Sequence, residues 1–342
     1  MGKKVTLGRT GIVSEKNAFG ALPIQRVPMD TAVPILQKAY RAGITFFDTA
    51  RSYTDSEEKL GAALSGVRKD IILATKTGAK TPEEMRKHLE TSLSLLKTDY
   101  IDVYQLHNPK FCPRPGDGTG MYEFMLDARD AGKIRFIGIT NHRLDVAEQA
   151  VASGLYDTLQ FPFSYLASDR DIALVRLCEE MNVGFIAMKA LSGGLITNAA
   201  AAYAWMAQYG GVLPIWGVQR ESELDEFISF IDSPPALTDE FSAVIARDRD
   251  ELTGEFCRGC GYCMPGCPAE IQIGTCARMS QFIRRSPSVS WSGESSREMM
   301  RKTEECTECG QCAEKCPYGL NPPDLLKRHY ADYKEYLAGF AK

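Results

Sequence analysis

The chain has 342 residues, of which 44% are hydrophobic and 25% are charged. These proportions are those of a globular protein, so a fibrous or largely disordered protein is excluded. Forty basic residues against 44 acidic ones give a net charge of -4, without the basic excess that nucleic-acid or anionic-membrane binding usually needs. No segment approaches the ~20 apolar residues of a membrane-spanning helix. We therefore expect a cytoplasmic protein with no nucleic-acid and no membrane partner.

Short apolar segments rich in β-branched residues alternate with amphipathic segments between residues 5 and 230, a pattern typical of βα units around a parallel sheet. Each predicted strand is followed by a predicted helix, and the strands cover residues 17–21, 44–50, 70–76, 100–107, 134–140, 158–163, 184–190 and 212–218. Eight such units indicate an α/β fold of the (β/α)8 TIM-barrel type rather than a doubly wound sheet, which more often has fewer strands. Residues 4–7 and 12–14 predict a hairpin that closes the N-terminal end of the barrel.

The alternation stops at Ser233, Pro234 and Pro235, where we place a domain boundary. The predicted domains are a barrel over residues 1–235 and a second domain over residues 236–342. A charged helix is expected to about Gly254, and the serine-rich residues 285–298 predict a loop. Large apolar residues at helical spacing predict a C-terminal helix with a packed face between residues 324 and 340.

Nine of the 11 cysteines follow residue 250, because only Cys112 and Cys178 precede it. Eight of the nine form two copies of the motif C-x2-C-x2-C-x3-C, each followed by proline. This spacing is typical of bacterial ferredoxins with two 4Fe-4S clusters, in which the last cysteine of each motif binds the other cluster. The two predicted ligand sets are Cys257, Cys260, Cys263 and Cys316 for one cluster, and Cys306, Cys309, Cys312 and Cys267 for the other.

Zinc and disulfides are the alternatives to iron–sulfur clusters. Zinc sites usually combine two C-x2-C pairs rather than a run of four cysteines with a terminal proline. Disulfides are disfavoured because a cytosolic chain keeps its thiols reduced. Cys276 lies outside both motifs, and we expect it to pack in the core like Cys112 and Cys178. Two clusters predict roughly eight iron atoms per chain.

Polar residues end several of the otherwise apolar strands, and in a (β/α)8 barrel these ends meet at the C-terminal mouth, where active sites lie. Asp48 ends the second predicted strand, Tyr53 follows it, Lys76 ends the third and His107 ends the fourth. A lysine beside the tyrosine is expected to lower the phenol pKa, and a nearby carboxylate keeps the lysine charged. Each residue alone suits an ordinary core salt bridge or hydrogen bond, so the prediction depends on their combination.

The chain resembles the aldo-keto reductases, specifically the members with a C-terminal two-cluster ferredoxin-like domain. The resemblance covers nearly the whole chain and depends on DTARSYTDSEEKLGAAL, TKTG, YIDVYQLHNP, GKIRFIGITN, LQFPFSYL and MKALSGG in the barrel, and CRGCGYCMPGCP and CTECGQCAEKCPYGL in the tail. It implies that Tyr53 is the general acid and that Lys76 lowers its pKa. It also implies that Asp48 supports the lysine and that His107 orients the substrate carbonyl.

The same resemblance implies a nicotinamide cofactor, either NADP or NAD, across the barrel mouth. Because no Gly-x-Gly-x-x-Gly follows a predicted strand, a Rossmann turn is not expected to hold it. The residues that the resemblance places against the carboxamide are Asn141 and Gln160. Those that it places near the pyrophosphate belong to the turn that contains Lys189, Leu191 and Gly193.

The adenosine end is implied to lie at residues 217–227, which include Gly217 and Arg220. Arg220 suits a 2'-phosphate, whereas Glu221 and Glu223 oppose one, so both cofactors stay open. Two positions depart from the family pattern. Thr54 replaces a glycine, and Met188 stands where many members place a ring on the nicotinamide.

These features predict an NAD(P)-dependent oxidoreductase that transfers hydride between nicotinamide and a small-molecule carbonyl or alcohol substrate, with Tyr53 as general acid. A hydride carries two electrons whereas a 4Fe-4S cluster takes one, and no flavin motif is visible to divide the pair. The clusters are therefore either structural or transfer electrons to a redox protein partner. The alternative function is an electron-transfer or redox-sensing iron–sulfur protein whose barrel binds a ligand or nicotinamide without turnover.

Overall fold

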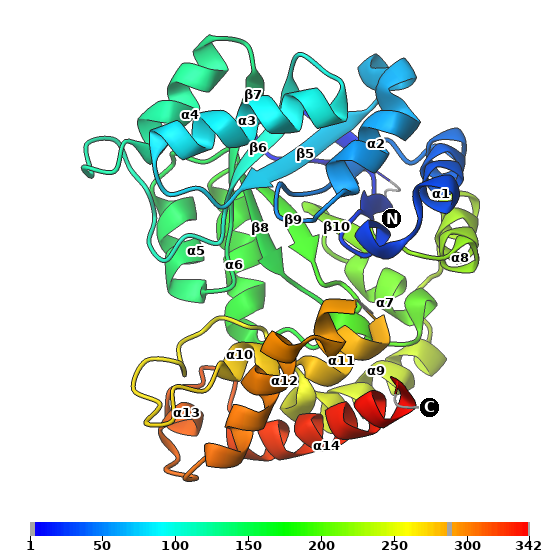
Figure 1. The fold of residues 1–342 in the computed structure, drawn as a ribbon. Coiled ribbons are helices and arrows are strands. Elements are labelled where there is room, and N and C mark those ends of the chain that lie inside the picture. Colours follow the sequence, from blue (N-terminus) through cyan, green and yellow to red (C-terminus); the bar gives the residue numbers. More distant parts are fainter. Residues whose placement is uncertain (1–3, 286–288, 341–342) are drawn as a thin grey trace. The chain divides into compact units, whose positions relative to one another are not determined.

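The computed structural model describes residues 4–285 and 289–340. The chain divides into two compact units, the first of Met1–Ala190 with Asn198–Ser242 and the second of Leu191–Thr197 with Ala243–Lys342 (Figure 1). The predicted boundary at residue 235 precedes helix α9 (Asp239–Leu252), and the division between the units falls inside this helix.

Eight parallel strands of the first unit close into a barrel in the order β10-β3-β4-β5-β6-β7-β8-β9. Each overlaps one predicted strand, so the prediction of a (β/α)8 barrel is confirmed. The strands are β3 (Ala18–Gly20), β4 (Phe46–Asp48), β5 (Ile72–Thr77), β6 (Ile101–His107), β7 (Ile134–Thr140), β8 (Thr158–Pro162), β9 (Gly184–Met188) and β10 (Val212–Gly217).

A helix follows each barrel strand. These helices are α1 (Met29–Arg41), α2 (Ser56–Leu64), α3 (Pro82–Leu96), α4 (Met121–Asp130), α5 (Leu144–Ala152), α6 (Asp169–Glu180), α7 (Ala199–Met206) and α8 (Glu221–Asp232). Short 3-10 turns, η1 (Pro23–Arg26), η2 (Ser65–Asp70) and η3 (Ser192–Gly194), lie in the connections. Local sequence fixes some starts: α3 begins with proline, and the Thr81 side chain accepts the Glu84 N–H at 3.3 Å.

The N-terminal hairpin of β1 (Lys4–Thr6) and β2 (Val13–Glu15) closes the barrel bottom, as predicted. Its apolar residues Val5, Leu7 and Ile12 join a buried cluster with side chains of the barrel strands. Gly8 forms a β-bridge with Val183, the residue just before β9 begins. The hairpin therefore shields one end of the barrel interior and leaves the chemistry to the opposite end.

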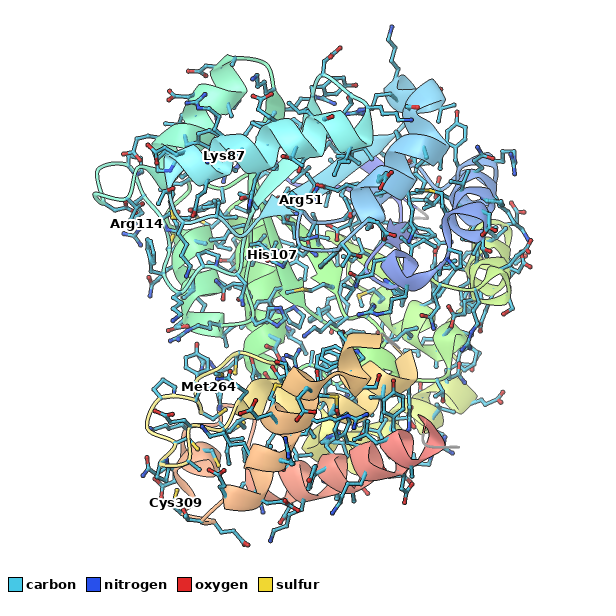
Figure 2. All side chains as sticks on the ribbon, in the orientation of Figure 1. Arg51, Lys87, His107, Arg114, Met264 and Cys309 are labelled. Atoms are coloured by element: carbon cyan, nitrogen blue, oxygen red, sulfur yellow. The ribbon has the colours of Figure 1, made fainter. Side chains whose placement is uncertain are left out.

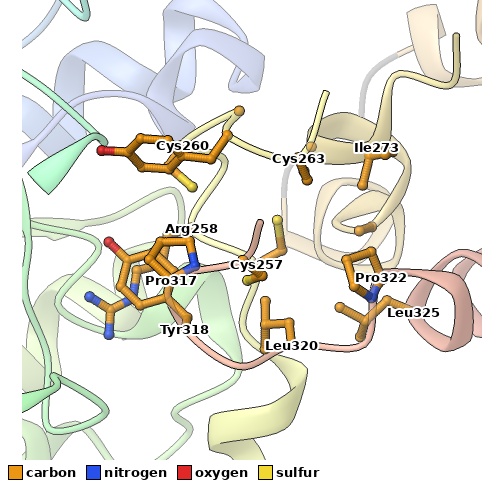
Figure 3. A pocket seen from close by; sticks show the side chains of 15 residues that line it. Cys257, Arg258, Cys260, Cys263, Ile273, Pro317, Tyr318, Leu320, Pro322 and Leu325 are labelled. Atoms are coloured by element: carbon orange, nitrogen blue, oxygen red, sulfur yellow. The ribbon is translucent and has the colours of Figure 1, made fainter. Parts of the chain in front are cut away.

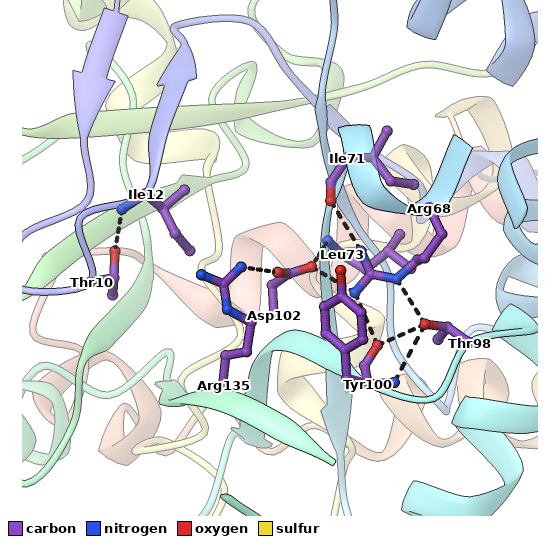
Figure 4. A network of polar contacts seen from close by, with 9 residues as sticks. All are labelled: Thr10, Ile12, Arg68, Ile71, Leu73, Thr98, Tyr100, Asp102 and Arg135. Atoms are coloured by element: carbon purple, nitrogen blue, oxygen red, sulfur yellow. Dashed lines mark hydrogen bonds and ion pairs between the residues drawn. The ribbon is translucent and has the colours of Figure 1, made fainter. Parts of the chain in front are cut away.

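A buried network of charges ties strands together at the N-terminal end of the barrel (Figure 4). Asp102, the second residue of β6, accepts hydrogen bonds from Arg68 Nη2 at 2.8 Å, Arg135 Nη1 at 2.6 Å and Leu73 N at 3.0 Å. The Arg68 guanidinium also lies 3.9 Å from the ring centroid of Tyr100. Because both carboxylate oxygens are bonded, this network suits a structural role.

The second unit is helical. Besides α9, its elements are η4 (Thr253–Glu255), α10 (Ile273–Cys276), α11 (Met279–Arg285), η5 (Val289–Ser292), α12 (Glu294–Arg301), η6 (Lys302–Glu305), α13 (Gln311–Glu314) and α14 (Pro322–Phe340). The predicted charged and C-terminal helices are thus present as α9 and α14. Leu325, Leu326 and Tyr333 of α14 pack on Cys276 and Met300, which makes one apolar core within this unit.

The prediction of a loop over residues 285–298 is wrong for its described second half, which forms η5 and the start of α12; residues 286–288 lie outside the described residues. The serines make local hydrogen bonds instead, since Ser296 Oγ donates to Ser290 O at 2.7 Å. Gly293 precedes α12 and accepts the Arg297 N–H at 3.1 Å. Across the parts of the chain described above, no helix combines the length and apolar character needed to cross a membrane.

Candidate functional site

The C-terminal ends of β4, β5 and β6 bring three of the predicted catalytic side chains to one mouth of the barrel. Asp48 is the last residue of β4, and Lys76 is the last but one of β5. His107, which is labelled in Figure 2, is the last residue of β6. Tyr53 lies in the turn between β4 and α2, where its N–H donates to Ala50 O at 2.9 Å.

Lys76 and Asp48 form a buried ion pair. Lys76 Nζ lies 2.6 Å from Asp48 Oδ1 and 2.6 Å from the carbonyl oxygen of Thr49. The amide groups of Gln105 and Gln160 each approach the Asp48 carboxylate at 3.4 Å. Burial raises the pKa of Asp48 and lowers the pKa of Lys76, and the charge of each partner opposes the shift of the other. The carboxylate thus has several donors that hold it in place.

Tyr53 lies between this ion pair and His107. Lys76 Nζ is 5.2 Å from the Tyr53 ring centroid, and the Tyr53 and His107 rings meet edge to face with centroids 6.0 Å apart. The expectation that Lys76 lowers the phenol pKa differs from the structure. Burial raises the pKa of Tyr53, and the Asp48 carboxylate adds to the rise. Because Lys76 is paired so closely with Asp48, its positive charge is largely cancelled at the phenol.

His107 is neutral over the physiological range. Burial lowers its pKa to about 3, and the nearby Lys76 charge adds to the fall. Ser52 Oγ lies 3.4 Å from His107 Nδ1. When the serine hydroxyl donates to Nδ1, the ring proton is on Nε2, which makes that nitrogen a hydrogen-bond donor.

The sequence analysis missed two polar residues beside this group. Gln105 is fully buried and touches Asp48; it lies two residues before His107, so strand alternation already places it on the same face. Glu57 is 1% exposed, pairs with Arg51 and accepts a hydrogen bond from Thr75 Oγ1 at 2.7 Å. A lone acid on a helix gives no sequence signal of such burial.

The two residues predicted at the nicotinamide, Asn141 and Gln160, differ in the hydrogen bonds that their side chains already make. Gln160 on β8 is 1% exposed, and its Oε1 has no hydrogen-bond partner in the described part of the chain. Asn141, which follows β7, uses both polar side-chain atoms. Its Nδ2 donates to Pro109 O and its Oδ1 accepts from Arg143 N, each at 2.8 Å. Of these two residues, Gln160 is therefore the one whose buried acceptor has no partner among the described residues.

The turn predicted at the pyrophosphate has an unusual backbone. Lys189, Ser192 and Gly193 all have positive φ, with values of 56°, 49° and 70°. Lys189 Nζ lies 3.3 Å from His142 Nδ1. Leu191 and Gly193 belong to the segment Leu191–Thr197, which groups with the second unit rather than with the barrel.

The residues predicted at the adenosine lie at the end of β10 and the start of α8. Gly217 ends β10, and a methyl group built on it would lie 3.2 Å from Pro23 Cγ. The Arg220 side chain is 65% exposed and lies 3.9 Å from Glu223. Glu223 accepts the N–H groups of Gln219 and Arg220, so it caps α8. Glu221 is paired with Lys38 at 2.6 Å.

The eight motif cysteines border two cavities in the second unit. The lining of the first includes Cys257, Cys260, Cys263 and Cys316 (Figure 3). The lining of the second includes Cys263, Cys267, Cys306, Cys309 and Cys312. The last cysteine of each motif thus lies beside the first three of the other, and sulfur donors with apolar walls suit an iron–sulfur cluster.

The cysteines outside the motifs are packed in cores, as predicted. Cys178 and Cys276 have no exposed surface, and Cys112 is 6% exposed. Arg114, on the loop after β6, is exposed and lies well apart from His107 in Figure 2. Within the described ranges, no three His, Cys, Asp or Glu side chains lie close enough to bind one metal ion.

Comparison with known families gives two matches. Residues 16–201 match the model of the aldo/keto reductase family, and residues 256–321 match the model of a 4Fe-4S dicluster domain. The two models match separate parts of the chain, one in the barrel and one around the cysteine motifs.

Curated relatives are similar to part of the chain. L-galactose dehydrogenase of Arabidopsis thaliana is 33% identical over 211 residues, which cover 56% of this chain and 66% of that protein. The aldo-keto reductase YhdN of Bacillus subtilis is 32% identical over 182 residues, which cover 49% of this chain and 54% of that protein. The chain thus spans less than two thirds of the length of either relative.

Solved structures share the fold. An aldo-keto reductase from Klebsiella pneumoniae in complex with NADPH aligns with a TM-score of 0.63 at 23% identity, over 72% of this chain and 95% of that one. An aldo-keto reductase from Bacillus halodurans aligns with the same score at 22% identity, over the same shares of the two chains.

Proposed function

The chain belongs to the aldo/keto reductase family, and from that premise we propose that it is an NAD(P)H-dependent oxidoreductase that reduces a small-molecule carbonyl compound. The observation that carries the proposal is the group at the barrel mouth, where Lys76 bonds Asp48 at 2.6 Å beside the Tyr53 ring. In this proposal the reaction belongs to the barrel of residues 1–235, and the clusters belong to residues 236–342.

Tyr53 is the proton donor in this proposal. A general acid must carry its proton when the substrate arrives, and the raised pKa of Tyr53 keeps the phenol protonated at neutral pH. The same shift disfavours the opposite role, in which a phenolate would remove a proton from an alcohol. The protonated phenol therefore suits the proton-donor role in carbonyl reduction.

His107 and the ion pair position the reactants. The neutral His107 ring, with its proton on Nε2, can donate a hydrogen bond to the substrate oxygen next to Tyr53. Asp48 fixes the Lys76 ammonium, so the positive charge stays near the phenol ring without moving toward solvent. These residues hold the carbonyl oxygen where the phenol proton can reach it.

A nicotinamide dinucleotide supplies the hydride when it is bound. Gln160 fits the nicotinamide end because its buried Oε1 lacks a partner in the described residues, and a carboxamide N–H would satisfy it. Asn141 can join it, because each of its two polar side-chain atoms makes one backbone hydrogen bond and can make a second. The NADPH complex of the Klebsiella pneumoniae structure, which shares the fold, supports the same cofactor class.

The adenosine end is proposed to include Gly217 and Arg220. Arg220 is 65% exposed, and Glu223 is 3.9 Å away, so its guanidinium is accessible to a 2'-phosphate. Glu221 is already neutralised by Lys38, which reduces its opposition to a phosphate. Lys189, Leu191 and Gly193 remain the proposed contacts of the pyrophosphate.

Two 4Fe-4S clusters are proposed for the second unit, one for each cysteine cavity. Cys257, Cys260, Cys263 and Cys316 would hold one, and Cys306, Cys309, Cys312 and Cys267 the other, consistent with the two cavity linings. Such clusters supply one-electron chemistry when present and also tie the two motifs together. A redox protein partner would be needed for electron transfer, whereas a structural role needs none.

The test is the Tyr53→Phe variant, which keeps the ring and removes only the proton donor. We expect NADPH-dependent carbonyl reduction to fall by about 10²- to 10⁴-fold, with NADPH binding unchanged by fluorescence titration. Tyr40→Phe is the matched control. Tyr40 lies on α1, and its hydroxyl donates a hydrogen bond to Asp70 of η2, away from the barrel mouth.

Full activity of Tyr53→Phe would refute the reductase mechanism. If the wild-type chain binds NADPH but reduces no member of a broad carbonyl panel, the alternative of an electron-transfer or redox-sensing protein replaces it. A dye-reduction assay that depends on the clusters and not on Tyr53 would point to the same alternative.

A further inference from the structure

A single guanidinium is packed against the loop that joins the first two cysteines of the first motif. A methyl group built on Gly259, which lies between Cys257 and Cys260, would be 2.7 Å from Arg278 Cζ and 2.8 Å from both terminal nitrogens. Gly259 has a φ of +70°. The absence of a side chain at this position thus lets the Arg278 charge approach the backbone of the proposed cluster loop.

Arg278 is held in place by contacts that leave its charge uncompensated. Its Nε donates to the carbonyl oxygen of Gly274 at 2.6 Å, and its Cζ lies 5.0 Å from the Phe282 ring centroid. Gly274 also lines the first cavity. No carboxylate of the described residues pairs with Arg278 in a salt bridge. The titratable groups that act on its charge are Cys257 and Cys260, two of the proposed cluster ligands.

The two cavities differ in cationic residues. The wall of the first includes Arg258, which is 6% exposed and stacks 4.0 Å from the Tyr318 ring centroid. No lysine, arginine or histidine is among the residues lining the second cavity. Lys315 belongs to the second motif and donates to Pro265 O of the first motif at 2.6 Å, but it is exposed to solvent, which screens its charge.

We propose that Arg278 raises the reduction potential of the iron–sulfur cluster in the first cavity. This inference rests on the proposed function, because it assumes that the cavity holds a 4Fe-4S cluster. Reduction adds one negative charge to a centre that already carries thiolate ligands. A fixed, partly buried positive charge next to that centre stabilises the reduced form more than the oxidised form.

The two proposed clusters are therefore expected to differ in how easily they are reduced. Arg278 packs on the cysteine loop of the first cavity, while Cys309 of the second is the one exposed ligand among the eight motif cysteines. Burial destabilises the reduced form of a cluster, because that form carries more negative charge. The positive charge of Arg278 offsets this destabilisation. The first cluster therefore stays reducible even though protein surrounds it.

The experiment is a potentiometric titration of the anaerobically purified full chain, followed by electron paramagnetic resonance. Dithionite is the reductant, and each cluster takes up one electron from it. For Arg278→Gln we expect the equilibrium constant for reduction of one cluster to fall about tenfold, which is 59 mV for a one-electron couple. Arg278→Lys keeps the charge and should keep the potential. Lys315→Gln makes the same change in net charge at an exposed site and should shift neither cluster.

Iron is counted first in every variant. If wild-type chains hold no iron, the proposal of two 4Fe-4S clusters fails before Arg278 is tested, and the proposed reduction in the barrel is unaffected. If wild-type chains hold both clusters and Arg278→Gln shifts neither potential, or Arg278→Lys shifts one as far as Arg278→Gln, only the inference fails. If Arg278→Gln loses iron, Arg278→Met is titrated instead. Methionine is also neutral and retains an apolar side chain beside Phe282. Iron loss from both neutral variants but not from Arg278→Lys would overturn potential tuning in favour of a role in cluster assembly.

Discussion

The ammonium of Lys76 and the carboxylate of Asp48 lie 2.6 Å apart inside the barrel, with 1% and 3% of their side chains exposed. An ion pair buried to this degree holds its geometry only while both charges are present, because removing one leaves the other unpaired in a low-dielectric interior. The pair therefore links the stability of the barrel to the proposed chemistry.

Replacing one partner of this pair is expected to destabilise the barrel strongly. Asp48→Asn leaves Lys76 with the Thr49 carbonyl as its main partner, and we expect the free energy of unfolding to fall by about 3–5 kcal/mol. Urea denaturation followed by fluorescence measures this. The double variant Asp48→Asn with Lys76→Met should cost less than the sum of the single changes.

A matched control is Asp70→Asn, since Asp70 lies outside the barrel mouth and bonds the exposed hydroxyl of Tyr40. That change should alter the free energy of unfolding by no more than about 0.5 kcal/mol. If Asp48→Asn were equally mild, the ion pair would not have the structural role argued above.

Carbonyl reduction is expected to be nearly independent of pH around neutrality. His107 has its pKa lowered to about 3, so its neutral form changes only as pH falls toward that value. The pKa of Tyr53 is raised, so the phenol loses its proton only at pH values above its ordinary range. Neither group therefore titrates between about pH 5 and about pH 9, and kcat/KM should be flat there.

The measurement is a pH profile of kcat/KM with NADPH saturating. His107→Gln should lower the rate without creating or removing a limb near neutrality. An acidic limb near pH 6.5 that disappears in His107→Gln, or a basic limb below pH 9 that disappears in Tyr53→Phe, would contradict the electrostatics described here.

The sequence was sufficient to predict most of the barrel because its strands are apolar, β-branched segments that end in polar residues. Asp48, Lys76 and His107 were recognisable as strand ends, and parallel strands in a closed barrel bring such ends together. Gln105 could not be assigned a partner from sequence, since alternation gives its face but not the distance to Asp48.

The pKa shifts at the site could not be predicted from strand patterns. A lysine near a tyrosine suggested a lowered phenol pKa, yet the shift depends on how completely Asp48 cancels the lysine charge and on burial. Similarly, the serines of residues 289–298 suggested a loop, because composition does not reveal that Ser296 bonds Ser290 and that Met300 is buried.

Arg220 is expected to decide between NADPH and NADH. If its exposed guanidinium binds a 2'-phosphate, Arg220→Ala should weaken NADPH binding by about 1.5–3 kcal/mol, the usual value of a hydrogen bond to a charged group, and leave NADH binding unchanged. Fluorescence titration with both cofactors measures the two affinities. Glu221→Gln is a useful companion, since it removes an acid that Lys38 already neutralises and should change the preference little. Equal loss of both cofactors in Arg220→Ala would place Arg220 outside phosphate recognition.

Crossed ligation of the clusters predicts which cysteine removes which cluster. Cys316 belongs to the second motif but lines the first cavity, and Cys267 belongs to the first motif but lines the second. Cys316→Ser should therefore perturb the cluster whose potential responds to Arg278→Gln, while Cys267→Ser should perturb the other. Iron analysis is expected to give roughly eight atoms for the wild type and about four for a variant that loses one cluster.

Cys276→Ser is the matched control, because Cys276 is fully buried in the same unit yet lines neither cavity. It should keep about eight irons, although burying a hydroxyl in an apolar core will lower stability. If Cys316→Ser instead removed the cluster that does not respond to Arg278, ligation would follow the order of the sequence. The two motifs would then be independent loops, and the neighbouring positions of Cys316 and the first three cysteines would need another explanation.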